Sequence, residues 1–177
     1  MGLKKVFQKW VLSSAIKSNG RKKVFNNLSK MKHVGIVFER NNDTTAQLVA
    51  KLAKFLHDQN IKIEVIAYVN LKKPTDELAQ KKSLTLFYKK DLNWIGKPKS
   101  DEIQNFIRNK FDLLIKADFS HSFPIEYICA ASQAALIAGP NDDLRNIYDF
   151  IIEVQNDSMN DFHQQLIHYL SIINQTP

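Results

Sequence analysis

From His33 onward, short apolar runs alternate with segments in which apolar residues recur every three or four positions. The runs have the length of strands and are rich in Val, Ile and Phe, which is typical of parallel strands buried on both faces. We expect strands at residues 33–38, 61–69, 83–88, 111–117, 135–138 and 148–154. Because helical segments between strands form right-handed crossovers, the pattern predicts an α/β fold around a mostly parallel sheet of about six strands.

The segments between the strands carry helix start signals. We expect helices from Asp43 or Thr44 to about Gln59, after Ser100, over 123–133, and after Asp157 or Ser158. The spacing of Thr44 and Gln47 is that of a capping box. Helices on both faces give a Rossmann-like three-layer sandwich with the expected strand order 3-2-1-4-5-6.

Two parts of this pattern are less regular: the end of the fifth strand and residues 71–82. The fifth strand is expected to stop at Gly139-Pro140, since these residues are typical of turns. Residues 71–82 leave two alternatives open: a short helix at 75–80, or a loop that lets the third strand run antiparallel.

The first 32 residues hold nine basic side chains and no acidic one, so they carry +9 and the remainder carries −2. Their apolar side chains recur at helical spacing, which predicts an amphipathic helix over 3–17: Leu3, Val6, Phe7, Trp10 and Val11. A short second helix or an ordered linker follows over 21–32. The expected organisation is a basic helical arm (1–32) followed by a single α/β domain (33–177).

Such a charge imbalance suggests an acidic partner, either RNA or an anionic membrane surface. The expected contacts are Lys4, Lys5, Lys9, Trp10, Lys17, Arg21, Lys22 and Lys23. The apolar stripe favours a helix at a membrane interface. If the stripe packs on the protein's own domain instead, the lysines are free for RNA, or serve only to keep a packed helix soluble.

A second basic cluster combines six lysines with Tyr88 and Trp94: Lys81, Lys82, Lys89, Lys90, Lys97 and Lys99. Basic and aromatic side chains together are used to bind single-stranded nucleic acid. Lysines are also a common protection of an edge strand against aggregation, and this alternative is favoured here.

Several chemistries are excluded by missing motifs. The five glycines stand at least fifteen residues apart, so neither a Walker A loop nor a dinucleotide fingerprint can be formed. Cys129 is the only cysteine, and no His-Glu-x-x-His sequence occurs. We therefore expect no metal site and no cofactor.

The best candidate pocket lies beyond the carboxyl ends of the first and fourth strands, where the strand order reverses. We call its polar residues the strand-end rim: Asn41, Asp43, Thr44, Asp118, Ser120 and His121. His121, Asp118 and Ser120 belong to one short loop, in which side chains diverge, so we assign no catalytic residue.

Certain segments also carry a resemblance: Trp94-Ile95-Gly96-Lys97-Pro98, Phe111-Asp112-Leu113-Leu114-Ile115, Ala131-Ser132-Gln133-Ala134 and Ala138-Gly139. Together they resemble a bacterial domain family of unknown function, known mainly from the Bacteroidetes. The resemblance covers nearly the whole chain and implies no catalytic residues. More distantly, the chain is similar to one Rossmann-like half of a two-domain glycosyltransferase.

Two functions follow from these features. The first is a non-enzymatic binding or adaptor module whose basic arm contacts an anionic surface, either a membrane face or RNA. The alternative is a small glycosyltransferase-like or nucleotide-binding enzyme that uses the strand-end rim. Residues 11–16 are too short an apolar run for a signal peptide, so we expect a cytoplasmic protein, at the inner membrane face if the arm binds lipid.

Overall fold

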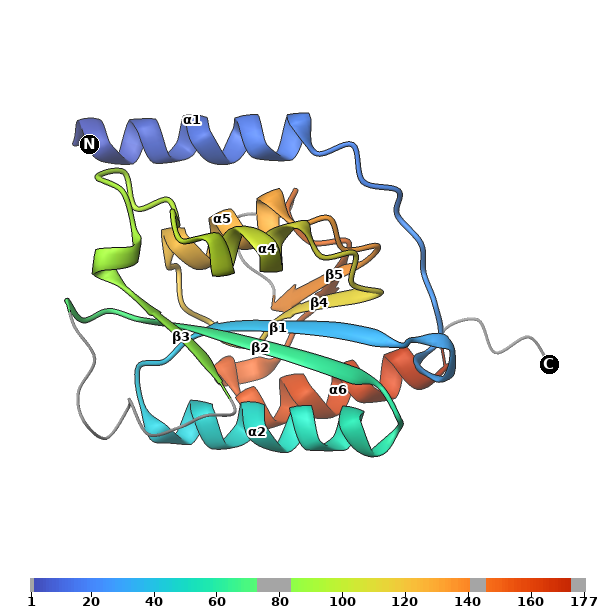
Figure 1. The fold of residues 1–177 in the computed structure, drawn as a ribbon. Coiled ribbons are helices and arrows are strands. Elements are labelled where there is room, and N and C mark those ends of the chain that lie inside the picture. Colours follow the sequence, from blue (N-terminus) through green and yellow to red (C-terminus); the bar gives the residue numbers. More distant parts are fainter. Residues whose placement is uncertain (1, 73–83, 141–145, 173–177) are drawn as a thin grey trace.

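A computed structural model describes residues 2–72, 84–140 and 146–172 (Figure 1). Within these residues, six strands form one sheet of order β3-β2-β1-β4-β5-β6, and all neighbours run parallel. The strands are β1 (His33–Glu39), β2 (Lys62–Val69), β3 (Thr85–Tyr88), β4 (Leu113–Lys116), β5 (Ile137–Pro140) and β6 (Phe150–Ile152). The predicted fold class and strand order are confirmed. The third strand is parallel, with Ile66 opposite Thr85.

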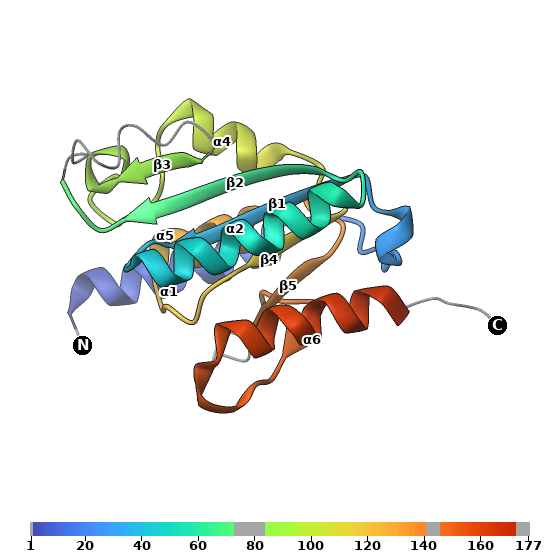
Figure 2. The ribbon, with the colours of Figure 1, turned by 90° about the horizontal axis from the view of Figure 1, so that it is seen from below.

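Helices cover both faces of the sheet (Figures 1 and 2). On one face lie α4 (Asp101–Arg108) and α5 (Phe123–Ala131), with α1 (Leu3–Ser18) outside them and in contact with α5. On the other face lie α2 (Asp43–Asp58) and α6 (Met159–Ile172). The apolar core is divided in the same way, because alternate strand residues point to opposite faces. Ile36 belongs to the α2 side and Val37 to the α1 side.

The predicted end of the fifth strand is wrong, since Gly139 and Pro140 both lie within β5 and pair with β6. The reason is the close approach of Tyr148. A Cβ on residue 139 would lie 2.7 Å from the Tyr148 ring, so glycine is required by packing there and not by a turn.

The start of α2 also differs from the prediction. The cap is Asn42, whose side-chain oxygen accepts a hydrogen bond from the Thr45 N–H at 2.8 Å. Asp43 and Thr44 are the first helical residues, and the Asp43 carboxylate pairs with Arg40 at 2.7 Å. The carboxylate can therefore favour the helix terminus electrostatically without being its cap.

Between α1 and β1 the chain is an ordered linker, which was one of the two alternatives expected for residues 21–32. It is extended except for one 3-10 turn at Leu28–Lys30. The Val24 N–H donates to the Ala135 carbonyl at 3.1 Å, and buried Asn27 donates to the Ser171 carbonyl at 3.0 Å. The alternatives for residues 75–80 lie outside the described residues. Among the described residues, no helix is both long enough and apolar enough to span a bilayer.

Candidate functional site

The inner face of α1 packs against the domain. Leu12 is buried in the core on the α5 side, and Val11, Ala15 and Ile16 pack against the same core. These positions follow helical spacing, but they differ from most of the apolar stripe predicted from the sequence. The helix therefore has two apolar stripes, of which only one is used for packing.

Two amide side chains, Gln8 within α1 and Asn19 just after it, bind α1 to the domain by hydrogen bonds. Near the beginning of the helix, the Gln8 amide donates to the Ile95 carbonyl at 2.6 Å. Just beyond its end, the Asn19 amide donates to the carbonyls of Ala130 and Ser132 at 3.0 and 2.7 Å. Because these bonds join residues far apart in sequence, they hold α1 in a defined position on the domain.

Arg21 continues this attachment. Its guanidinium lies 2.6 Å from the carboxylate of Asp149, whose side chain is only 2% exposed. Lys23 reaches the same carboxylate at 2.8 Å, and the Ile137 N–H donates to it at 2.9 Å. Arg21 and Lys23 were expected to contact an anionic surface. Both share the single carboxylate of Asp149, which leaves one positive charge, and the Lys23 side chain is still 61% exposed, so this expectation stays a prediction.

The other apolar stripe of α1 points away from the domain. We call Leu3, Val6, Phe7 and Trp10 the outer face of α1. Leu3 is 80% exposed and Trp10 is 68% exposed, and Val6 and Phe7 are also exposed. Phe7 also touches a residue from a distant loop, since its ring meets the ring of Trp94 edge-on at 5.7 Å. A contiguous group of large apolar side chains in water is typical of an interaction surface.

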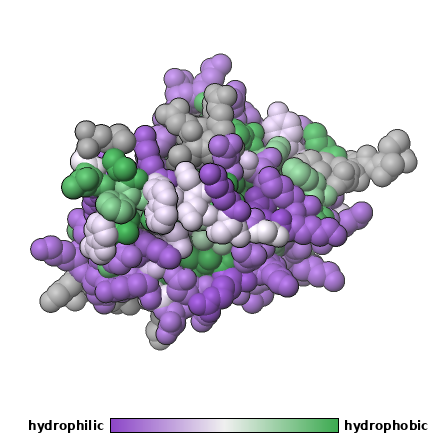
Figure 3. All heavy atoms as spheres, turned by 90° about the horizontal axis from the view of Figure 1, so that it is seen from above, coloured by the Kyte–Doolittle hydropathy of each residue, from purple (hydrophilic) through white to green (hydrophobic). Residues whose placement is uncertain are grey.

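Basic side chains border the outer face of α1. Six of the predicted basic contacts are exposed: Lys4, Lys5, Lys9, Lys17, Lys22 and Lys23. The first acid in the sequence is Glu39, which is buried. Figure 3 views this side of the molecule and shows a group of hydrophobic residues at the left, bordered by hydrophilic ones. The surface is thus apolar at its centre and positive at its border.

At the strand-end rim, Asp118 is surrounded by donors from its own chain. Its carboxylate accepts hydrogen bonds from the Glu39 N–H and from both the N–H and the hydroxyl of Ser120. The ammonium of Lys116, which is fully buried in β4, lies 2.9 Å from the same carboxylate. It also donates to the Asp118 carbonyl at 2.7 Å. Asp118 was expected at this position from the sequence, whereas Lys116 was not.

The other rim residues do not form a catalytic arrangement with Asp118. His121 is 67% exposed, and its Nδ1 lies 3.9 Å from a Glu126 carboxylate oxygen, which is beyond hydrogen-bond distance. Asn41 and Thr44 are exposed at the start of α2, and Asp43 pairs with Arg40. Ser122 stands at the N-terminus of α5 without a side-chain capping bond. The arrangement stabilises the loop and offers no aligned nucleophile and base.

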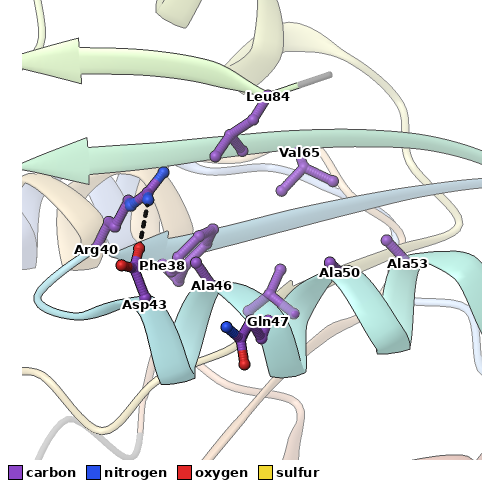
Figure 4. Close-up of a pocket in the computed structure, with 10 residues that line it drawn as sticks. Phe38, Arg40, Asp43, Ala46, Gln47, Ala50, Ala53, Val65 and Leu84 are labelled. Atoms are coloured by element: carbon purple, nitrogen blue, oxygen red, sulfur yellow. Dashed lines mark hydrogen bonds and ion pairs between the residues drawn. The ribbon is translucent and has the colours of Figure 1, made fainter. Parts of the chain in front are cut away.

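A groove of about 460 Å³ lies between α2 and the sheet (Figure 4). Its walls are mostly apolar, and Arg40 and Asp43 stand at one end, joined to each other. Of the strand-end rim, only Asp43 lines it. Leu84, which forms part of its wall, is the first described residue after position 72. The volume of the groove would suit a small ligand, but the guanidinium of Arg40 is already paired with Asp43.

The titratable groups give no second candidate. Within the described ranges, no group of three or more His, Cys, Asp or Glu side chains is arranged to hold a metal ion. His163 is buried in α6, and burial lowers its pKa to about 4. Glu64 lies at the other end of the sheet from the rim, and its partial burial by itself would raise the pKa of its carboxyl group. Lys62 and His33 outweigh this effect, so its pKa is lowered.

Comparison with known proteins identifies a family for this chain but no individual relative. A model of a family of unknown function (DUF6913) matches residues 4–173. None of the curated proteins matches the chain. The match includes α1 and extends over the whole sheet to α6. The chain therefore belongs to this family of unknown function, DUF6913.

Proposed function

We propose that this protein attaches to anionic lipid membranes through the outer face of α1, as a non-enzymatic binding or adaptor module. The observation that carries the proposal is a helix with two apolar stripes. One stripe is packed on the domain, while the other is exposed and bordered by lysines. Helices that lie in a membrane interface have this composition, with Trp, Phe and Leu on one side and Lys beside them.

The aliphatic side chains of the outer face favour lipid over RNA. Leu3 and Val6 have no role in contacting a phosphate backbone, whereas both lose water contact on entering the acyl boundary. Trp10 is amphipathic and is the kind of side chain enriched at the level of lipid headgroups. A second copy of the chain is disfavoured as the occupant, because a symmetric contact would bring together the lysines of both copies.

The charges supply the preference for anionic lipid. A lysine near an anionic leaflet contributes about 1 kcal/mol to binding, and the effect decreases within a Debye length. Lys4 and Lys9 lie on α1 three residues from Phe7 and Val6, so they stand on either side of the outer face, and both are exposed. Binding should therefore be strong at low salt and weak at high salt or on neutral lipid.

The test is cosedimentation of the full chain with vesicles of phosphatidylcholine alone and of phosphatidylcholine with phosphatidylglycerol. We expect binding to the anionic vesicles only. The double variant Lys4→Gln/Lys9→Gln should bind about 30-fold more weakly, since it loses about 2 kcal/mol. The matched control is Lys51→Gln/Lys54→Gln on α2, which lies on the opposite side of the sheet and should bind normally.

A parallel titration with single-stranded RNA separates the two anionic partners. RNA binding that falls with added salt, without any binding to vesicles, would overturn the proposal in favour of nucleic acid. The same conclusion would follow if Lys4→Gln/Lys9→Gln weakened RNA binding while substitutions in the outer face of α1 had no effect on it.

A further inference from the structure

The chain has two tryptophans, Trp10 and Trp94, and each is 68% exposed. They come from segments far apart in sequence, yet they belong to one surface. Trp10 stands three residues after Phe7 on α1, so the two side chains are neighbours on the helix. Phe7 in turn contacts Trp94. Phe7 thus lies between the two tryptophans: it is one helical turn from Trp10 and its ring contacts that of Trp94, on the loop that follows β3.

The turn that carries Trp94 is held in a fixed shape. The side-chain oxygen of Asn93 accepts hydrogen bonds from the N–H groups of Ile95, Gly96 and Lys97, at 3.0, 3.1 and 2.9 Å. The Asn93 N–H donates to the Lys97 carbonyl at 2.9 Å, and the Gly96 N–H donates to the Asn93 carbonyl at 2.9 Å. These five bonds close the turn around residue 94 and leave its ring outside.

The same turn is fastened to the domain and to α1. Gly96 has φ +104°, which favours glycine, and a Cβ there would lie 3.1 Å from the Phe123 ring. The Ile95 carbonyl accepts the hydrogen bond from Gln8 of α1. The position of Trp94 relative to Trp10 is therefore set by packing and hydrogen bonds, although both rings lie mostly in water.

We infer that Trp94 is a second membrane anchor, which enters the headgroup region together with the outer face of α1. The inference rests on the function proposed above and extends it to a second segment. A fixed turn that presents a large aromatic ring to water leaves apolar area unburied, and burial of that area at the lipid interface would stabilise the bound state. Exposed Lys99 adds positive charge near this anchor.

Two anchors on different segments have a consequence for orientation. A single helix lying on a membrane leaves the attached domain free to roll about the helix axis. Trp94 lies beside α1 and not on it, so simultaneous insertion of both tryptophans narrows the range over which the domain can roll. The domain would then present the same face of its sheet to the membrane in every bound molecule.

The two tryptophans make the test specific to each anchor. In Trp94→Phe only Trp10 emits, and in Trp10→Phe only Trp94 emits. We expect both variants to show a blue-shifted emission and protection from acrylamide when anionic vesicles are added. A shift from Trp10 alone would overturn the second anchor and leave the proposed function intact. No shift and no cosedimentation from either variant would overturn both.

A binding measurement complements the fluorescence. Trp94→Ala should reduce partitioning into anionic vesicles about tenfold, since one large aromatic side chain would no longer be buried. Tyr169→Ala is the matched control, because Tyr169 is an exposed aromatic residue on α6, on the far side of the sheet. The melting temperatures of both variants should match the parent, which separates anchoring from folding. Equal partitioning of Trp94→Ala and Tyr169→Ala would contradict the inference.

Discussion

The strand-end rim and the outer face of α1 use their side chains in opposite ways. At the rim, polar and charged groups are buried and satisfied by one another, as in the pair of Lys116 and Asp118. On α1, large apolar groups are left in water although a packing face exists on the same helix. The difference teaches that polar and charged residues at the strand ends need not form a ligand site. Large apolar residues that are exposed to water are the better indication of a binding surface.

The largest expected effect tests whether the rim is structural. Asp118→Ala removes the partner of a buried ammonium and leaves the Glu39 N–H without its acceptor. We expect the free energy of unfolding to fall by about 3–5 kcal/mol, measured by urea denaturation. Asp161→Ala, on the exposed side of α6, is the control and should change little. An Asp118→Ala protein of normal stability would mean that the rim is held for another purpose, and ligand binding there would then be the first alternative.

The next effect compares the two stripes of α1. Leu12→Ala creates a cavity against α5 and should lower the free energy of unfolding by about 2–3 kcal/mol. Leu3→Ala should leave stability unchanged and weaken vesicle binding instead, because Leu3 is exposed. Urea denaturation and cosedimentation of both variants give the four values. If both substitutions altered stability alike, the outer face would be part of the fold and the comparison would fail.

The smallest effect concerns two histidines, one buried and one at the rim. The pKa of His163 is about 4 in the folded protein and about 6.5 when unfolded, so the unfolded chain binds more protons between these values. Stability should therefore fall as the pH is lowered from about 6.5 to about 4, by about 2 kcal/mol at pH 5.

Urea denaturation at pH 7 and pH 5 checks this expectation. His163→Leu should remove much of the pH dependence in that window, because the titrating group is gone. His121→Leu should retain it, since His121 is exposed. An unchanged pH dependence in His163→Leu would contradict the expectation.

Most of the fold could be predicted because its signals are local. The apolar runs of β1 and β4 mark central strands whatever surrounds them, and the helix start signals lie within a few residues of each start. The direction of β3 could not be predicted, since it depends on the pairing of Thr85 with Ile66. The division of the chain at residues 32 and 33 stays a prediction, and the bond between Arg21 and Asp149 leads us to expect that the domain without its arm is less stable.

The candidate site was predictable in part. The apolar residues of the outer face and the lysines beside them were visible as a sequence pattern. The position of Leu12 in the sequence, however, did not indicate which of the two stripes packs on the domain. Trp94 was assigned to a different cluster, because nothing local links it to Phe7. At the rim, a lysine inside the apolar run of β4, two residues before Asp118, was a signal that sequence analysis could have used.

The attachment of α1 also sets an order of events during synthesis. The helix is translated before the domain on which it packs. The Asn19 amide can form its hydrogen bonds only after the carbonyl groups 111 and 113 residues further along the chain have been translated. At about 5–20 residues per second, that delay is about 6–20 s. During this interval both stripes of the nascent helix are uncovered. The helix thus reaches its final place only after most of the sheet has been translated, and until then it is open to a chaperone or to a nearby bilayer.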